Sequence, residues 1–229
     1  KVVKEGLRLL GHTQEADNSI HFSYEMVALT PATAKALGME LAAEDAGRAY
    51  VEMSGRKGLG VKADDLMDAM EKKATDSVRD GGKAEGLSDE EMRSLGRDVA
   101  VAALRYFMLK YGRNKVIAFD FDEALTFEGD SGPYLQYSTV RVQNIFRKMK
   151  ERGVDPLIDD RSLDNLTLNE GLTDEMWELV RLSAEMPAAI RRAVDSLELS
   201  VVTHQLLELA QKFNSFYHKY PILNEKDDA

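Results

Sequence analysis

The sequence predicts a mainly helical protein in which a short α/β segment comes before a helical bundle. From about residue 63 onward, apolar residues recur with the period of helices that pack on one face. Extended, β-forming patterns are found at residues 19–29 and 116–121. We therefore expect two units: an N-terminal α/β unit at residues 1–62 and a helical unit at residues 63–229.

In the first unit, a helix and a strand should be followed by a second, shorter helix. Residues 1–10 have an amphipathic pattern, and residues 19–29 are rich in β-forming side chains. Thr30 and Pro31 then mark a helix start, because threonine caps a helix and proline fits its first turn. We expect that short helix to end near Gly38.

The second unit contains clear helix boundaries. Ser88, with Glu91 three residues later, forms a capping box and predicts a long helix that ends near Tyr111. Pro133 opens another helix after a loop at residues 127–132. Besides the helix from Ser88, helices are expected at residues 63–78, 133–151, 173–185, 187–197 and 201–220.

The composition excludes several kinds of protein. The 229 residues contain no cysteine, so disulfides and thiolate metal sites are excluded, and a cytoplasmic location is the default expectation. No run of about 18 apolar residues is present, so we expect no membrane span. The four histidines are scattered, so we expect no metal site. The net charge of −10 means that any contact with nucleic acid must come from local clusters.

The glycine-rich segment at residues 53–60 is the first candidate site. Its glycines allow close approach of the backbone to a ligand, and Ser54, Arg56 and Lys57 supply hydrogen-bond donors and two cations. Such a loop suits a polyphosphate. The alternative is a solvated basic turn, which the composition of the segment alone favours.

The neighbouring residues support the first interpretation. Met-Ser-Gly-Arg-Lys-Gly at residues 53–58, followed by the Asp64-Asp65-Leu66 helix start, resembles the second signature loop of class I aminoacyl-tRNA synthetases, and of the arginine enzymes in particular. The resemblance implies that this loop binds ATP, with Ser54, Arg56 and Lys57 acting on the phosphates and Met53, Gly55 and Gly58 contacting the nucleotide. Glu52 departs from the motif, which has its first lysine there.

The strongest resemblance lies further along the chain. Residues 124–137 resemble the stretch of arginyl-tRNA synthetases that leads into the anticodon-binding helical bundle. Further matching pieces lie before and after this stretch, in the order of that family, so that the resemblance extends from about Tyr24 to Leu223. The resemblance implies the C-terminal remnant of a Rossmann-like α/β catalytic domain followed by an all-α anticodon-binding bundle.

In such an enzyme, arginine and ATP with Mg²⁺ form arginyl-adenylate, and the arginine passes to tRNA(Arg). We expect the first signature motif to precede Lys1, so that this chain alone should not aminoacylate. One alternative is a non-catalytic, stand-alone paralogue that binds tRNA; another is a helical scaffold without an RNA role.

The helical unit contains candidate contacts for tRNA. Arg141, Lys148 and Arg152 share one face of the helix from Pro133, a face that could instead be merely solvated. Aromatic and polar side chains near the ends of the bundle helices could stack on bases or bond to them. The predicted tRNA-binding residues are Tyr134, Gln136, Arg141, Lys148, Asn214 and Tyr217.

For three groups of residues, a structural role is the preferred interpretation. Tyr137 is expected to pack rather than to contact RNA. Phe213 and Phe216 form a stripe with Tyr217 that is typical of a helical core. The acidic cluster at residues 120–123 could form an acid–base pair, but it is expected to tie neighbouring helices together or cap a turn.

Overall fold

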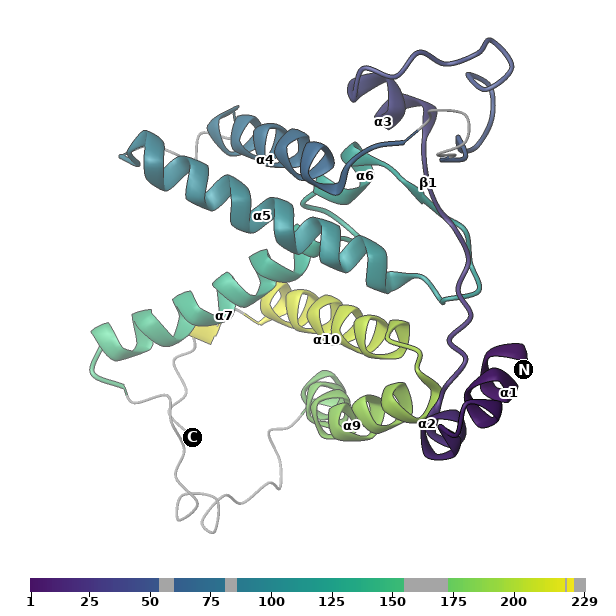
Figure 1. Ribbon diagram of the computed structural model, residues 1–229. Helices are drawn as coiled ribbons and strands as arrows, with labels where there is room; N and C mark the ends of the chain where they lie inside the picture. Colours follow the sequence, from purple (N-terminus) through teal and green to yellow (C-terminus); the bar gives the residue numbers. More distant parts are fainter. Residues whose placement is uncertain (54–59, 81–85, 155–172, 221, 225–229) are drawn as a thin grey trace.

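The computed structural model describes the chain except for residues 54–59, 81–85, 155–172, 221 and 225–229. Helices dominate the described residues, beside a small sheet of two strands, and the prediction of a mainly helical fold is confirmed (Figure 1). That the first unit is a Rossmann-like remnant stays a prediction, as does the boundary at residue 62. No helix among the described residues is long and apolar enough to cross a membrane.

The sheet joins two short parallel strands that are far apart in the sequence. β1 (Val27–Leu29) pairs with β2 (Ile117–Phe119), with Val27 opposite Ile117 and Leu29 opposite Phe119. Leu29 also forms an isolated antiparallel bridge with Val51. The expected strand at residues 19–29 is therefore too long, because only its last three residues have a β-strand partner in the described structure.

Each strand leads directly into a short helix, and the two helix caps are bonded to each other. Thr30 caps α3 (Pro31–Ala36), and Asp120 caps α6 (Phe121–Leu125) by accepting from two backbone N–H groups. The Thr30 hydroxyl donates to Asp120 at 2.7 Å. Burial opposes ionisation of Asp120, but these hydrogen bonds outweigh it and lower its pKa. The acidic cluster thus serves as a cap, as expected.

Two long helices pack against the sheet and its short helices. α4 (Ala63–Asp80) packs along α5 (Asp89–Lys110), which begins with the predicted capping box. The helices approach closely at Gly96, where a Cβ atom would lie 2.1 Å from the Thr75 hydroxyl. The core between these helices and the strands includes Met70, Ala74, Val99, Phe107 and Phe119.

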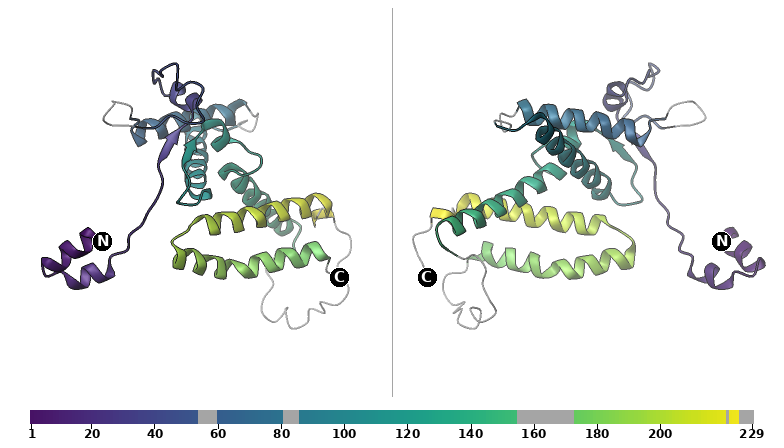
Figure 2. Two further views of the ribbon diagram at one scale, coloured as in Figure 1. Left: turned by 90° about the vertical axis from the view of Figure 1, so that its right-hand side faces the viewer. Right: turned by 60° about the vertical axis from the view of Figure 1, so that its left-hand side comes forward.

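The bundle contains α7 (Gly132–Glu151), α9 (Asp174–Ser196), α10 (Ser200–Lys219) and a short 3₁₀ turn, η2 (Ile222–Asn224). The expectation of separate helices at residues 173–185 and 187–197 is wrong, because α9 runs straight through Pro187. α9 buries Leu182 before the proline and Ala189 after it, and it lies beside α10 in both figures (Figures 1 and 2). Packing on both sides of Pro187 outweighs the lost backbone bond.

The first two helices lie apart from this body. α1 (Val2–Leu9) and α2 (Thr13–Asn18) contact each other at the end of an extended segment that leads to β1 (Figure 2). α1 buries none of its residues, although its amphipathic helix forms as predicted. Its Arg8 side chain is bonded to Asp17 of α2, so the two short helices support each other.

Candidate nucleic-acid interface

A cleft of about 290 Å³ lies between α7 and the C-terminal end of the chain's last long helix, α10. α7 supplies most of its wall, while α10 and η2 close the opposite side. Its lining combines basic, aromatic and apolar side chains: Tyr137, Val140, Arg141, Asn144, Ile145, Lys148, Tyr217 and Leu223.

The half-buried guanidinium of Arg141 is at the centre of the polar contacts. Its Nη1 donates to Asn214 Oδ1 at 2.5 Å, and its Nη2 donates to the Tyr137 hydroxyl at 2.7 Å. Its Cζ lies 4.6 Å from the centroid of the Tyr137 ring and 5.3 Å from that of Tyr217. Cation–π attraction and two hydrogen bonds therefore fix the plane of this cation.

Asn214 joins α10 to α7 through three hydrogen bonds. Besides accepting from Arg141, its Nδ2 donates to the Tyr134 hydroxyl at 2.9 Å and to Ser138 Oγ at 2.7 Å. Ser138 is buried, and its own hydroxyl donates to the Tyr134 carbonyl oxygen. The polar groups of Asn214 are thus satisfied within the protein.

The charges of the cleft are of one sign. Lys148 is exposed on its rim, and Arg152 donates to the Leu223 carbonyl oxygen of η2. Within the described ranges, no carboxylate forms an ion pair with Arg141, Lys148 or Arg152. A cleft lined by cations and aromatic rings suits the phosphates and unstacked bases of a single-stranded nucleic acid, despite the net charge of −10.

Close packing fixes the N-terminal end of α7 against α5. Ser131 caps α7, and a Cβ atom on Gly132 would lie 2.4 Å from the Ala102 carbonyl oxygen of α5. The glycine is therefore required for the two helices to approach this closely. This contact determines where Tyr134, two residues later, is held.

A buried cation supports the loop just before α7. Lys110 Nζ, which is buried, donates to Glu123 at 2.7 Å and to the Asp130 carbonyl oxygen at 3.2 Å. Burial alone would lower the pKa of Lys110, but the bond to Glu123 and the charge of Asp130 raise it overall. The Tyr106 hydroxyl donates to Asp130 at 2.5 Å, and burial together with this bond raises the pKa of Tyr106.

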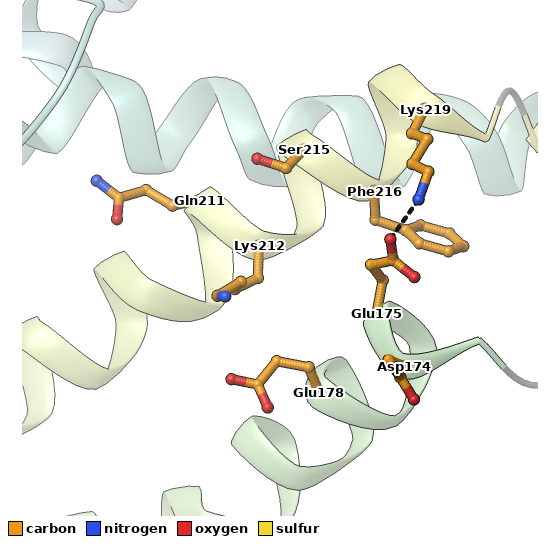
Figure 3. A pocket seen from close by; sticks show the side chains of 8 residues that line it. All are labelled: Asp174, Glu175, Glu178, Gln211, Lys212, Ser215, Phe216 and Lys219. Atoms are coloured by element: carbon orange, nitrogen blue, oxygen red, sulfur yellow. Dashed lines mark hydrogen bonds and ion pairs between the residues drawn. The ribbon is translucent and has the colours of Figure 1, made fainter.

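The other side of α10 has a larger pocket of about 620 Å³, shared with α9 (Figure 3). Here the cations face carboxylates. Lys219 donates to Glu175 across the two helices, and this bond lowers the pKa of Glu175. Asp174 and Glu178 lie on the same side, so the pocket would repel a phosphate backbone rather than attract it.

A metal site is not indicated by the geometry. In the part of the chain that the structure describes, no three His, Cys, Asp or Glu side chains are grouped so as to hold a metal ion. The side chains that line the α7–α10 cleft offer hydrogen bonds, positive charge and aromatic faces.

The chain is similar in sequence to a known domain family and to known proteins. Residues 135–229 match the family model described as "DALR anticodon binding domain". An arginine–tRNA ligase of Bacteroides thetaiotaomicron is 31% identical over 210 residues, which are 92% of this chain and 31% of that protein. An arginine–tRNA ligase of Thermococcus kodakarensis is 34% identical over 227 residues, 98% of this chain and 32% of that protein.

The fold agrees as well. The structure of Thermus thermophilus arginyl-tRNA synthetase superposes with a TM-score of 0.67 at 27% sequence identity, covering 99% of this chain and 31% of that one. The resemblance to arginyl-tRNA synthetases is confirmed. The chain spans about a third of the length of the relatives it matches.

The structure brings together most of the residues predicted to bind tRNA. Tyr134, Arg141, Asn214 and Tyr217 form one connected group, and Lys148 lines the same cleft. Gln136 does not join them: its Nε2 donates to the backbone carbonyl oxygen of Asp98 on α5, and its Oε1 is buried without a partner among the described residues.

Two members of the group were not among the predicted tRNA-binding residues. The Tyr137 ring was expected to pack, yet it is 43% exposed and lies against Arg141. Its position one helical turn before Arg141 was the available signal. Ser138 gave no signal, because its role depends on Asn214 from a distant helix. Phe216 is buried, as the core interpretation of the aromatic stripe predicts.

The predicted phosphate-binding loop cannot be placed in the same way. Ser54, Gly55, Arg56, Lys57 and Gly58 lie outside the described residues. Met53, just before them, packs against the core of α4, α5 and the strands, whereas Glu52 is exposed. The roles of these residues stay predictions.

Proposed function

We propose that this chain is part of an arginine–tRNA ligase and that its α7–α10 cleft binds the anticodon region of tRNA(Arg). The observation that carries the proposal is the cleft itself, where cations and aromatic rings meet and no described carboxylate pairs with the cations, at residues that match an anticodon-binding family. Lys148 would contact phosphate, while Tyr134, Tyr217 and the fixed guanidinium of Arg141 would face bases. Gln136, bonded to α5, would not take part.

The signature loop would serve the first step of the whole enzyme's reaction. By its resemblance, Ser54, Arg56 and Lys57 would bind the phosphates of ATP, the substrate that is used together with Mg²⁺ and arginine, and Met53, Gly55 and Gly58 would shape the loop around the nucleotide. The cationic side chains would neutralise charge as pyrophosphate leaves. We place the enzyme in the cytoplasm, where its tRNA partner is charged.

The direct test is binding of this chain to an arginine tRNA transcript and to the same transcript with a replaced anticodon loop. The proposal predicts weaker binding to the replaced loop, and an affinity for the original that falls as salt rises. Equal binding to both transcripts would contradict anticodon recognition.

A second candidate is a non-catalytic, stand-alone paralogue that binds tRNA. One observation favours it: Glu52, an exposed carboxylate, stands where the signature motif has its first lysine. Reading the gene upstream of Lys1 separates the two, because only the ligase requires the first signature motif there. Arginine-dependent ATP–pyrophosphate exchange by the protein from the complete gene is the matching activity assay.

A further inference from the structure

We infer that Asn214 is a positioning residue that fixes the Arg141 guanidinium and the Tyr134 hydroxyl, rather than a residue that contacts RNA itself. The inference rests on the proposed function, because it assigns roles within the same cleft. It also separates two residues, Asn214 and Tyr217, that the sequence could only present as equivalent candidates.

The hydrogen bonds of Asn214 carry the first step. An asparagine amide has two N–H donors, and here one meets the Tyr134 hydroxyl at 2.9 Å while the other meets Ser138 Oγ at 2.7 Å. Its Oδ1 accepts from Arg141 at 2.5 Å. No N–H of Asn214 remains to donate to a base, and its Oδ1 already accepts from Arg141, so these bonds tie this amide to its protein neighbours.

The second step concerns the N–H donors of Arg141 that remain to bind RNA. A guanidinium has five N–H donors in a planar fork, and the bonds to Asn214 and Tyr137 use two of them. Because the plane is also held against the Tyr137 and Tyr217 rings, the remaining donors point in a set direction. A cation that is ordered before binding loses less conformational entropy when it binds.

Tyr134 is oriented by the same amide. Its hydroxyl oxygen accepts from Asn214, so its own hydrogen is available to donate elsewhere. Over the stretches that the structure describes, that hydrogen has no acceptor. Asn214 therefore holds two donor groups, one from Arg141 and one from Tyr134, on the side of α7 that faces α10.

All partners of Asn214 lie on α7, although the residue itself belongs to α10. The amide is therefore also a tie between these helices, and a variant at this position could act simply by loosening the bundle. The experiment must distinguish positioning from direct contact and from such a loss of stability.

The first experiment is a double-mutant cycle in the complete 229-residue chain, with the arginine tRNA transcript as probe. We expect Arg141→Ala to weaken binding by roughly 10- to 100-fold, and Asn214→Ala by roughly 5- to 10-fold. The double variant should lose at least about threefold less than the product of the two single losses, because residues that act together are not additive.

If the loss of affinity in the double variant equals the product of the two single losses, the inference is overturned, because Asn214 would then act on RNA independently of Arg141. The matched control is Gln211→Ala, an exposed position on α10 that lines the opposite pocket. It should leave the affinity within about twofold of the wild type. Thermal unfolding of each variant, and binding measured well below each midpoint, keeps loss of folding out of the comparison.

The second experiment needs no RNA. In ¹⁵N NMR spectra of the wild-type chain, restricted rotation should give Arg141 separate Nη signals, and Asn214→Ala should average them. Nη signals that are averaged in the wild type, or unchanged in Asn214→Ala, would overturn the positioning role. Failure of the wild type to bind the transcript would instead reject the proposed function, so the two failures are distinguishable.

Discussion

The cations on the two sides of α10 have different partners. Towards α7, Arg141 is held by an amide, a phenol and two aromatic rings, and Lys148 is exposed beside it. Towards α9, Lys219 is bonded to Glu175, and two more carboxylates line the pocket. Both sides have a hollow, and the larger one is on the α9 side.

The difference shows that the larger of the two hollows is the one lined by carboxylates. An ion pair on the α9 side neutralises Lys219, whereas neutral hydrogen-bond partners on the α7 side orient Arg141, which pairs with no carboxylate among the described residues. In a chain with a net charge of −10, this arrangement concentrates positive potential in one place.

The largest effect should come from replacing the cation on the α7 side with alanine, with the cation on the α9 side as the comparison. Arg141→Ala should weaken binding of the arginine tRNA transcript by roughly 10- to 100-fold and lower the salt dependence, because it removes charge-assisted hydrogen bonds. Lys219→Ala should change the affinity less than about twofold, because its charge is already paired. Fluorescence anisotropy titrations at several salt concentrations measure both, and equal losses would remove the distinction between the two sides.

The next effect concerns the contact that places α7. Gly132→Ala should destabilise the fold by ~1–3 kcal/mol, because the added Cβ meets the α5 backbone. Gly112→Ala is the matched control: its Cβ would lie 3.8 Å from the nearest Glu198 atom, so we expect a change within ~0.5 kcal/mol. Urea unfolding measures both, and a Gly132→Ala variant as stable as the control would show that α7 can shift freely.

A smaller effect is expected at the buried cluster that supports the start of α7. Tyr106→Phe should cost ~1 kcal/mol, because it removes the hydrogen bond to the half-exposed Asp130. The raised pKa values of Tyr106 and Lys110 mean that both groups contribute stability below about pH 10 that is lost as the pH rises further.

The alkaline loss of stability should therefore be smaller in Tyr106→Phe than in the wild type. Urea midpoints measured from pH 8 to about pH 11 test this expectation. Parallel curves for the two proteins would show that Tyr106 does not titrate differently in the folded and unfolded states.

The smallest effect should be at the exposed ion pair on the α9 side. Glu175→Gln should lower the unfolding midpoint only slightly, because exposed ion pairs contribute little. The lowered pKa of Glu175 means that its contribution is present at neutral pH and is lost as the pH falls below 4.5. Thermal unfolding of both proteins should thus converge in acid; a gap that widens there would contradict this assignment.

Local signals in the sequence predicted much of this structure. Three helix starts are predicted correctly from Ser88, Thr30 and Pro133, because the residues that cap a helix act within one turn of its end. Tyr134, Arg141 and Lys148 lie on one helix, so their closeness follows from local sequence, whereas their role in binding tRNA stays a prediction. The rest depends on contacts between distant segments, which periodicity does not reveal.

The features that the sequence does not predict depend on such contacts between distant segments. Pro187 does not end α9, because packing of both halves against α10 outweighs one missing hydrogen bond. Gln136 donates to the α5 backbone and Asn214 donates to α7, contacts that local sequence does not predict, while the role of both residues in tRNA binding stays untested. Neither partner could be known before α7 was placed against α5 and α10.

The central claim is that RNA lies on the α7 side of α10. The most direct test places a photo-crosslinking amino acid at Asn144, which lines the cleft, or at Gln211, which lines the α9 pocket; both are exposed. With the arginine tRNA transcript bound, we predict crosslinks from position 144 to the anticodon loop and none from position 211. Crosslinking from position 211 alone would contradict the account.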